Sequence, residues 1–509
     1  MLDATPLLRL YARWRLRQLT AQDPKATQAA QLLRLVRQAR RTRFGRDHDF
    51  AAIRSVDDFQ RRVPLRKYED FHEAYWRHEF PVLRNCTWPG TIPYFAVTSG
   101  TTADVTKYIP CSHQMNRSNR RGGMDILVHH VANRPHSRIL GGRSFMLGGS
   151  TDLTQHAPGV LSGDLSGIAV KAMPRWARMR YFPPLDLALI ADWEKKVEVL
   201  ANRSLEEDIR MLSGTPSWML VLIDRLAELR PEAAHRLAGI YENLELVIHG
   251  GVNFAPYRRR FAELMEGSRA ETREVYAASE GMIAVADRGD GEGMRLELDT
   301  GLFYEFVPLE ELDAAAPTRH WVANAELGVN YAVVLSTCAG VWGYVLGDTV
   351  KFVSLDPPRI LVTGRTSYML SAFGEHLIGE EIEEAVSHAA EIIGATLTDY
   401  SVAPVFPAAK GELGGHLYVV EFAGGVPRGP KISRFASAVD DYLSRTNEDY
   451  QAHRAGGFGL RAPEVAAVAP GTFAAWMKHR GKLGGQNKVP RIINDQELFA
   501  DLQAFRANN

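Results

Sequence analysis

Between about residues 50 and 365 the sequence alternates helical stretches with short apolar strands, and this alternation restricts the fold more than any other feature. The clearest unit is LELVIHGG (244–251), an apolar run that ends in two glycines and is followed by a helical stretch through YRRRFAELM (257–265). Alternating strands and helices are typical of mixed α/β domains, because the helices cover the faces of the sheet. The sequence therefore predicts a mixed α/β fold.

The pattern changes after SLDPPRILVTGRT (354–366), where glycine and proline cluster. Beyond it, residues 379–391 and 431–447 have helical spacing, and HLYVVEFAG (416–424) indicates a strand. A chain of 509 residues is also long for one hydrophobic core. We expect a large N-terminal domain over residues 1–365 and a small α+β C-terminal domain over 366–509, joined by a hinge near Arg365.

The overall charge and the cysteines exclude several classes of protein. The 60 Lys and Arg residues balance 60 Asp and Glu residues, which does not favour a nucleic-acid partner. Cys86, Cys111 and Cys338 have no paired spacing, so we expect neither a disulfide framework nor a zinc site. No apolar run approaches the roughly 18 residues of a membrane helix, and the start of the chain lacks the apolar core of a signal peptide. We expect a cytoplasmic protein without a membrane partner, and a monomer, although the sequence does not determine the oligomeric state.

The first 46 residues are basic, with ten arginines and only two aspartates. Apolar residues recur there at helical spacing: Leu8, Trp14, Leu16, Leu32, Leu33, Leu35 and Val36. This pattern predicts two amphipathic helices that bury these residues and expose the arginines to solvent. The alternatives are a transit peptide or a helix that lies on a lipid surface.

The first of three polar loops is TSGTTADVTK (98–107), which departs from the G-x-x-x-x-G-K-[ST] pattern of nucleoside triphosphatases. Phosphate can also be bound by hydroxyl groups and backbone N–H groups of a tight turn. The hydroxyl groups here belong to Thr98, Ser99, Thr101 and Thr102, while Gly100 allows a close backbone approach and Lys107 adds positive charge. The alternative is a loop that binds nothing.

The second loop is YAASEG (276–281). Glu280 could bind magnesium, Tyr276 could offer a flat face to a base, and Ser279 could donate a hydrogen bond. The alternative is the start of an ordinary helix.

The third loop is GYVLGDTVKF (343–352). Its Asp348 could accept two hydrogen bonds from a ribose diol. The alternative is a common Gly-Asp turn.

The order of these loops, followed by GRTSYMLSAFGEHLIGEEIE (364–383), resembles the adenylate-forming superfamily of acyl-activating enzymes. The resemblance is closer to the Gretchen Hagen three family of acyl acid-amido synthetases, whose loops are S-S-G-T-[ST]-x-G-x-x-K, Y-x-A-S-E-G and Y-R-x-G-D. It extends from FGRDHDF (44–50) to QNKVPRI (486–492) and includes GTPSWML, IHGGVNF and LFYEFVPLEEL.

The resemblance implies ATP and Mg²⁺ as cofactors, with Glu280 directed towards the metal. It also implies that Lys488 comes from the small domain to contact the α-phosphate and the carboxylate under attack. The residues implied to bind ATP are Thr98, Ser99, Gly100, Thr101, Thr102, Lys107, Gly250, Gly251, Tyr276, Ser279, Asp348 and Arg365.

The resemblance further implies a ligase that joins a small carboxylic acid to AMP and transfers the acyl group to an amine, with an amino acid as the expected acceptor. The alternatives are transfer to a thiol such as coenzyme A, or a non-catalytic nucleotide-binding homologue. Three positions depart from the family pattern: Asp104 replaces a glycine, and Gly343 and Val345 stand where the family usually has arginines. A hydrolase would need a G-x-S-x-G motif, which the chain lacks.

The acyl group would bind among residues 120 to 250. The apolar side chains of this region either line that pocket or belong to the core: Met124, Phe145, Met146, Trp176, Trp218 and Met219.

Overall fold

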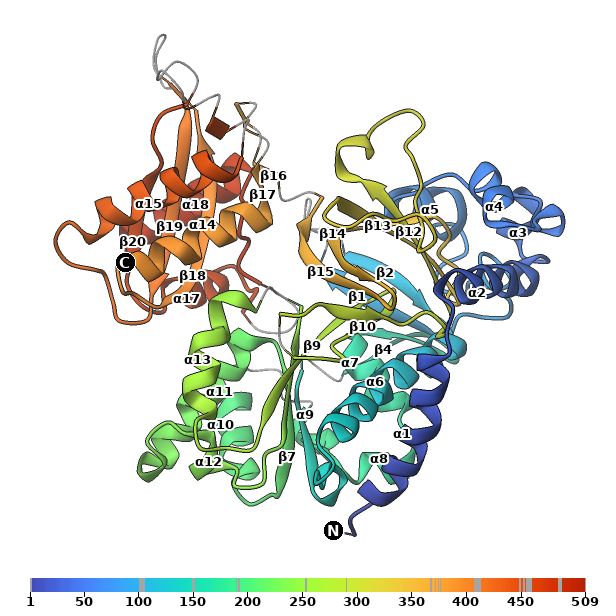
Figure 1. Ribbon diagram of the computed structural model, residues 1–509, viewed down its shortest axis with the longest axis horizontal. Coiled ribbons are helices and arrows are strands. Elements are labelled where there is room, and N and C mark those ends of the chain that lie inside the picture. Colours follow the sequence, from blue (N-terminus) through green and yellow to red (C-terminus); the bar gives the residue numbers. More distant parts are fainter. Residues whose placement is uncertain are drawn as a thin grey trace. The chain divides into compact units, whose positions relative to one another are not determined.

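A computed structural model describes residues 2–99, 106–148, 152–188, 190, 193–251, 254–289, 291–366, 369–370, 372–373, 375, 377–406, 413–447, 450–451, 454, 460–483 and 488–508. The chain divides into two compact units, Met1–Val362 and Thr363–Asn509. The break falls within strand β15 (Pro358–Arg365). Helices and strands alternate along both units, so the predicted mixed α/β fold is confirmed (Figure 1).

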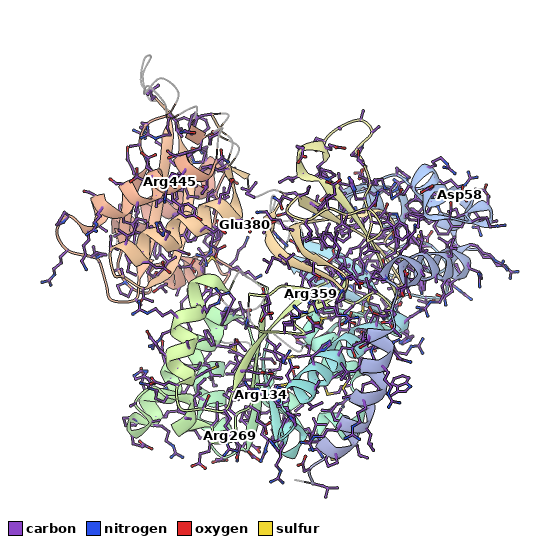
Figure 2. All side chains as sticks on the ribbon, viewed as in Figure 1. Asp58, Arg134, Arg269, Arg359, Glu380 and Arg445 are labelled. Atoms are coloured by element: carbon purple, nitrogen blue, oxygen red, sulfur yellow. The ribbon has the colours of Figure 1, made fainter. Side chains whose placement is uncertain are left out.

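An eleven-stranded sheet forms the centre of the large unit, in the order β12-β13-β14-β15-β11-β10-β9-β8-β7-β3-β6. Strands β6, β3, β7, β8 and β9 pair parallel with one another in that order. Strand β9 pairs antiparallel with β10, and the pairs β10–β11, β12–β13 and β13–β14 are antiparallel as well. The strands are β3 (Arg143–Leu147), β6 (Tyr181–Phe182), β7 (Ile209–Gly214), β8 (Leu246–Gly250), β9 (Glu271–Ala278), β10 (Gly281–Val285), β11 (Met294–Leu296), β12 (Leu302–Pro308), β13 (Asn330–Thr337), β14 (Tyr344–Leu355) and β15. Arg359 on β15, labelled in Figure 2, donates hydrogen bonds of 2.9 and 2.7 Å to Asp287, which follows β10.

A second sheet of four strands has the order β2-β1-β5-β4. Its strands are β1 (Tyr94–Ser99), β2 (Thr106–Cys111), β4 (Thr154–Ala157) and β5 (Val160–Gly163). Strands β1 and β2 pair antiparallel, with Thr98 opposite Lys107. The hydroxyl-rich segment of the sequence therefore joins two strands of one hairpin.

The helices of the large unit cover both faces of the parallel strands, as the alternation in the sequence predicts. On β8, Val247 packs in a cluster with residues of α10, α11 and α13, whereas Leu246 and Ile248 pack with residues of α1 and α6. The helices are α1 (Thr5–Thr20), α2 (Pro24–Ala39), α3 (Arg43–Asp47), α4 (Val56–Arg62), α5 (Tyr68–Phe71), α6 (His113–Asn133), α7 (Leu165–Ala172), α8 (Arg175–Arg178), α9 (Leu185–Ala188), α10 (Trp193–Ser204), α11 (Pro216–Leu229), α12 (Leu237–Ile240) and α13 (Ala255–Met265).

The two predicted N-terminal helices are α1 and α2, and their buried faces differ in part from the prediction. Leu8, Leu32, Leu35 and Val36 are buried, and Leu16 and Leu33 are half-buried. The expectation for Trp14 is wrong, because 54% of its surface is exposed. The expectation that the arginines face solvent is wrong for Arg15, which is fully buried. Its guanidinium lies 2.6 Å from Asp125 and 2.8 Å from Asp299, so two carboxylates compensate the buried charge.

The small unit contains a three-stranded sheet in the order β18-β19-β20. Residues of α14 and α15 pack with the sheet in one buried cluster, and residues of α17 and α18 pack with it in another. The predicted helices at 379–391 and 431–447 and the predicted strand at 416–424 correspond to α14, α15 and β19. The elements are β16 (Met369–Leu370), β17 (Leu377–Ile378), α14 (Gly379–Ile392), β18 (Leu397–Val405), β19 (Gly415–Phe422), α15 (Lys431–Thr446), β20 (Glu464–Val468), α17 (Thr472–His479) and α18 (Gln496–Asn508).

Among the residues described above, no helix combines the length and the apolar character that crossing a membrane requires. The three cysteines are buried thiols without a disulfide. Burial raises the pKa of each thiol to about 12.

Candidate functional site

The hairpin of β1 and β2 carries the first predicted loop. Thr98 lies opposite Lys107 and Ser99 opposite Thr106, so the strands extend to both ends of that loop. Three predicted phosphate-binding residues, Gly100, Thr101 and Thr102, lie outside the described residues, as do Asp104 and the side chains of Thr98 and Ser99.

Lys107 is held from one side by the short helix α5. Its Nζ lies 3.0 Å from Oε1 of Glu69 and 5.1 Å from the centre of the Tyr68 ring. The Tyr68 hydroxyl accepts a hydrogen bond of 3.0 Å from the backbone N–H of Tyr108. Sequence reasoning missed Glu69 and Tyr68, because they are far from the loop in the chain. These contacts hold the lysine at the base of the hairpin.

The second predicted loop is a tight turn between two strands. Strand β9 ends at Ala278 and β10 begins at Gly281, and the two strands pair antiparallel around Ser279 and Glu280. The alternative of a helix start is therefore wrong. Gly281 has φ +152°, and a β-carbon there would lie 2.9 Å from Cδ2 of Leu302, so the turn requires glycine at this position.

The third predicted loop is a bulge within a strand. Strand β14 continues from Tyr344 to Leu355, so the alternative of a Gly-Asp turn is wrong. The pairing of β13 with β14 shifts register between Ala332 and Val334, opposite the segment that contains Gly347 and Asp348. Bulges change the direction of side chains, and Gly347 has φ +90°, which glycine adopts most readily.

The structure brings the second and third loops together. The hydroxyl of Tyr276 donates a hydrogen bond of 2.8 Å to Oδ2 of Asp348. Tyr276 is 6% exposed and Asp348 is half-buried. The two residues are 72 positions apart in the chain, and sequence reasoning placed both at one nucleotide site.

Glu280 is buried beside Tyr344, the first residue of β14. Burial, and then the charge and the hydrogen bond of Glu280, raise the pKa of the Tyr344 phenol. The ring of Phe71 in α5 lies 6.1 Å from that of Tyr344. Sequence reasoning missed Tyr344, although the aromatic residue of the Y-x-x-G-D pattern was a signal for it. The phenol orients the carboxylate that the sequence assigns to the metal.

Gly250 is the last residue of strand β8, and Gly251 follows it. A β-carbon at Gly250 would overlap the carbonyl oxygen of Val275 on the neighbouring strand β9, and Gly251 has φ +81°. Strand pairing and backbone conformation therefore explain both glycines, and their predicted contact with ATP stays a prediction.

Arg365 and Lys488 both lie in the second unit and are exposed. Their predicted contacts with ribose and with the α-phosphate stay predictions.

Most of the apolar residues between 120 and 250 named from the sequence pack in the core. Phe145 and Met219 are fully buried in the cluster between the sheet and α10, α11 and α13, and Trp218 packs against that cluster. Met124 packs against the cluster of α1 and α6, and Met146 is half-buried. The side chain of Trp176 lies outside the described residues.

Within the described part of the chain, no group of three or more His, Cys, Asp or Glu side chains could hold a metal ion. In nucleotide sites Mg²⁺ is usually held by one or two carboxylates, by water and by phosphate oxygens of the substrate. A single carboxylate such as Glu280 fits that role.

Comparison with known proteins gives matches to three family models that cover most of the chain. The GH3 family N-terminal domain matches residues 15–174 and 156–270, the central domain matches 296–365 and the C-terminal domain matches 380–497. The chain is 26% identical over 209 residues to indole-3-acetic acid-amido synthetase GH3.8 of Oryza sativa subsp. indica, covering 38% of this chain and 33% of that protein. It is 25% identical over 209 residues to jasmonoyl-L-amino acid synthetase GH3.5 of Oryza sativa subsp. japonica, covering 38% and 35%. The matched segment thus spans about a third of the length of these relatives.

Two solved structures share the fold. The AtGH3.15 acyl acid amido synthetase in complex with 2,4-DB has a TM-score of 0.81 at 16% identity, over 96% of this chain and 95% of that one. A 2-hydroxyisobutyryl-CoA ligase in the postadenylation state has a TM-score of 0.61 at 16% identity, over 95% and 92%. At these identities the likeness establishes the architecture.

Proposed function

The chain belongs to the GH3 family, the Gretchen Hagen three family, and we propose that it is an ATP-dependent ligase that activates a carboxylic acid as an acyl-adenylate and transfers the acyl group to an amine. The observation that carries this proposal is the 2.8 Å hydrogen bond from Tyr276 to Asp348. It joins two loops whose residues suit a base and a ribose and whose order along the chain is that of the family.

Each part of the site has a role in this reaction. The β1–β2 hairpin, with Lys107 at its base, binds the phosphates of ATP. Asp348 and Arg365 hold the ribose, and Tyr276 stacks on the base. Glu280, beside the phenol of Tyr344, would hold magnesium, which would neutralise phosphate charge.

The first step forms a bond between a carboxylate oxygen of the acid and the α-phosphorus of ATP and breaks the bond to pyrophosphate. Both reactants are anionic, so positioning and fixed positive charge supply most of the catalysis. Lys488 contributes its ammonium at the α-phosphate. In the second step the amine nitrogen attacks the acyl carbon and loses a proton, and AMP leaves.

A second candidate acceptor is the thiol of coenzyme A. It is supported by the fold shared with 2-hydroxyisobutyryl-CoA ligase. The amine is preferred because the relatives in sequence are named as an indole-3-acetic acid-amido synthetase and a jasmonoyl-L-amino acid synthetase.

We also propose that the enzyme works as a monomer in the cytoplasm on small-molecule acids and amines. Its need for ATP and its three unpaired cysteines support that compartment.

Exchange of labelled pyrophosphate into ATP, measured over a panel of carboxylic acids, tests the first step. We expect the native protein to catalyse exchange with at least one acid. The exchange rate of Glu280→Gln should be lower by about 10² to 10³, because this variant lacks the carboxylate proposed to hold the metal. Amino acids and coenzyme A are then supplied as acceptors with the active acid. An amide product supports the proposal, and a thioester supports the second candidate. A folded protein without exchange for any acid supports the non-catalytic alternative.

A further inference from the structure

Helix α1 has an apolar face that points away from the protein. Leu7, Leu10 and Trp14 are 70%, 61% and 54% exposed, and their spacing of three and four residues places them in one line along the helix. We call these three residues the α1 stripe. The ring of Tyr11 lies 5.6 Å from that of Trp14 and adds to the same side. Large apolar side chains rarely gather on a surface that contacts only water.

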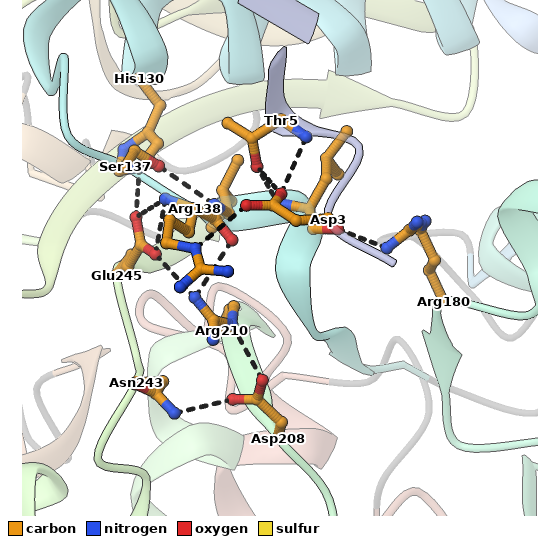
Figure 3. Close-up of polar contacts among 12 residues, drawn as sticks. Asp3, Thr5, His130, Ser137, Arg138, Arg180, Asp208, Arg210, Asn243 and Glu245 are labelled. Atoms are coloured by element: carbon orange, nitrogen blue, oxygen red, sulfur yellow. Dashed lines mark hydrogen bonds and ion pairs between the residues drawn. The ribbon is translucent and has the colours of Figure 1, made fainter. Parts of the chain in front are cut away.

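The N-terminal end of α1 is fixed by a polar network (Figure 3). Asp3 accepts hydrogen bonds of 2.9 and 2.6 Å from the backbone N–H and the hydroxyl of Thr5, and one of 3.1 Å from Arg138. The backbone N–H of Ala4 donates to the carbonyl oxygen of Leu140 at 3.3 Å. These contacts tie the start of the helix to the segment that follows α6.

Three further contacts fix the middle and the end of α1. Arg15 pairs with Asp125 on α6 and with Asp299, and Arg295 donates a hydrogen bond of 2.5 Å to the carbonyl oxygen of Leu19. Rotating the helix to bury the stripe would expose Leu8 and break the Arg15 ion pairs. The outward direction of the stripe is therefore set by the rest of the fold. Figure 1 shows α1 beside α6, on the outside of the large unit.

Positive charge borders the stripe. Arg13 and Arg17 are exposed, and at about 100° per residue they lie about 60° and 20° around the helix axis from Leu10. Residues 5–20 contain no aspartate or glutamate. A surface that covers the stripe therefore meets arginines without a neighbouring acid in the same helix.

We propose that the α1 stripe docks on an anionic lipid surface. Leucine and tryptophan enter the boundary between headgroups and acyl chains, while long arginine side chains extend to lipid phosphates. The cytoplasmic leaflet carries the negative charge that this pattern complements. In a symmetric dimer through α1, by contrast, Arg13 and Arg17 would face the same two positive charges of the second copy, which opposes the contact. This proposal replaces the expectation of no membrane partner.

Sedimentation with vesicles of phosphatidylcholine, with and without phosphatidylglycerol, tests the proposal on the full chain. We expect binding only to the anionic vesicles. Leu7→Ser combined with Leu10→Ser should reduce binding at least tenfold, because both side chains leave the lipid. Arg13→Gln combined with Arg17→Gln should reduce vesicle binding about 25-fold, since each arginine near such a surface contributes about fivefold.

Matched controls change exposed residues elsewhere. Leu327 is 58% exposed, and Arg428 and Arg434 are exposed arginines of the small unit. Leu327→Ser, and Arg428→Gln combined with Arg434→Gln, should bind like the native protein. All substituted side chains are exposed, so the midpoint of thermal unfolding should stay the same in every variant.

Three results would overturn the proposal. The first is native-like vesicle binding by the leucine variant, and the second is equal binding to neutral and anionic vesicles. The third is a native dimer that does not bind vesicles and that Leu7→Ser with Leu10→Ser converts to a monomer, which would assign the stripe to a second copy of the chain.

Discussion

Replacing Asp348 by alanine should weaken ATP binding without unfolding the protein. The carboxylate is half-buried in the bulge of β14 and accepts the 2.8 Å hydrogen bond from Tyr276, so it is already oriented before a ribose arrives. Substitution to alanine removes the acceptor and leaves the strand intact, because the side chain does not take part in the strand pairing.

The magnitude follows from the charge of the acceptor. A hydrogen bond to a charged group contributes about 1.5 to 3 kcal/mol, so the loss of one ribose hydrogen bond should raise the Kd for ATP about tenfold to 150-fold. Tyr276→Phe removes only the hydroxyl that orients Asp348. A neutral hydrogen bond contributes about 0.5 to 1.5 kcal/mol, so the Kd of this variant for ATP should rise about twofold to twelvefold.

Isothermal titration calorimetry with ATP and Mg²⁺ measures both effects. Asp356→Ala is the matched control, because Asp356 is exposed and lies just beyond the end of β14. It should bind ATP like the native protein. An unchanged Kd in a folded Asp348→Ala variant would refute the ribose assignment. A larger loss in Tyr276→Phe than in Asp348→Ala would refute the argument that the tyrosine acts through the aspartate.

Three further predictions concern other parts of the chain. Asp104→Gly should leave pyrophosphate exchange within a few fold of native, whereas a rise of about a hundredfold, roughly 2.7 kcal/mol, would show that this acid impairs the phosphate loop. Lys488→Ala should lower the rate of pyrophosphate exchange by about 10² to 10³ but still form amide from supplied acyl-adenylate. Lys482→Ala should change the rates of exchange and of amide formation little. Loss of exchange in Lys482→Ala rather than in Lys488→Ala would contradict the role of Lys488. Burial opposes ionisation of Glu271, yet the hydrogen bond from His130 and nearby positive charge bring its pKa from 4.5 to about 2. The contribution of this carboxylate to the free energy of unfolding is present above pH 4.5 and is lost as the pH falls towards 2. The free energy of unfolding in urea should therefore depend less on pH in that window for Glu271→Gln than for the native protein. An unchanged pH dependence would disprove the assignment.

Local patterns in the sequence were sufficient to predict several elements of the fold. The helix and the strand predicted at 379–391 and 416–424 are α14 and β19, because the spacing of apolar residues there already matches buried faces. The residue types of the loops around Tyr276 and Asp348 likewise indicated a common site. In both cases the information lies in a few consecutive residues.

The pairing of distant segments was decided by the tertiary structure. Glu280 lies in a turn rather than at a helix start because β10 returns along β9, and Tyr344 of β14 meets Glu280 from a distant part of the chain. Lys107 likewise meets Glu69 through α5, which no local pattern specifies.

The burial of α1 is the clearest case of the difference between the two kinds of information. The sequence indicated two helices within the first 46 residues from apolar residues at helical spacing, since that spacing depends on neighbours within one or two turns. It did not determine which side of the helix is buried, because both sides are partly apolar. Asp125 and Asp299 decide this by compensating the charge of Arg15 from 110 and 284 positions away, and Trp14 is consequently left facing outward.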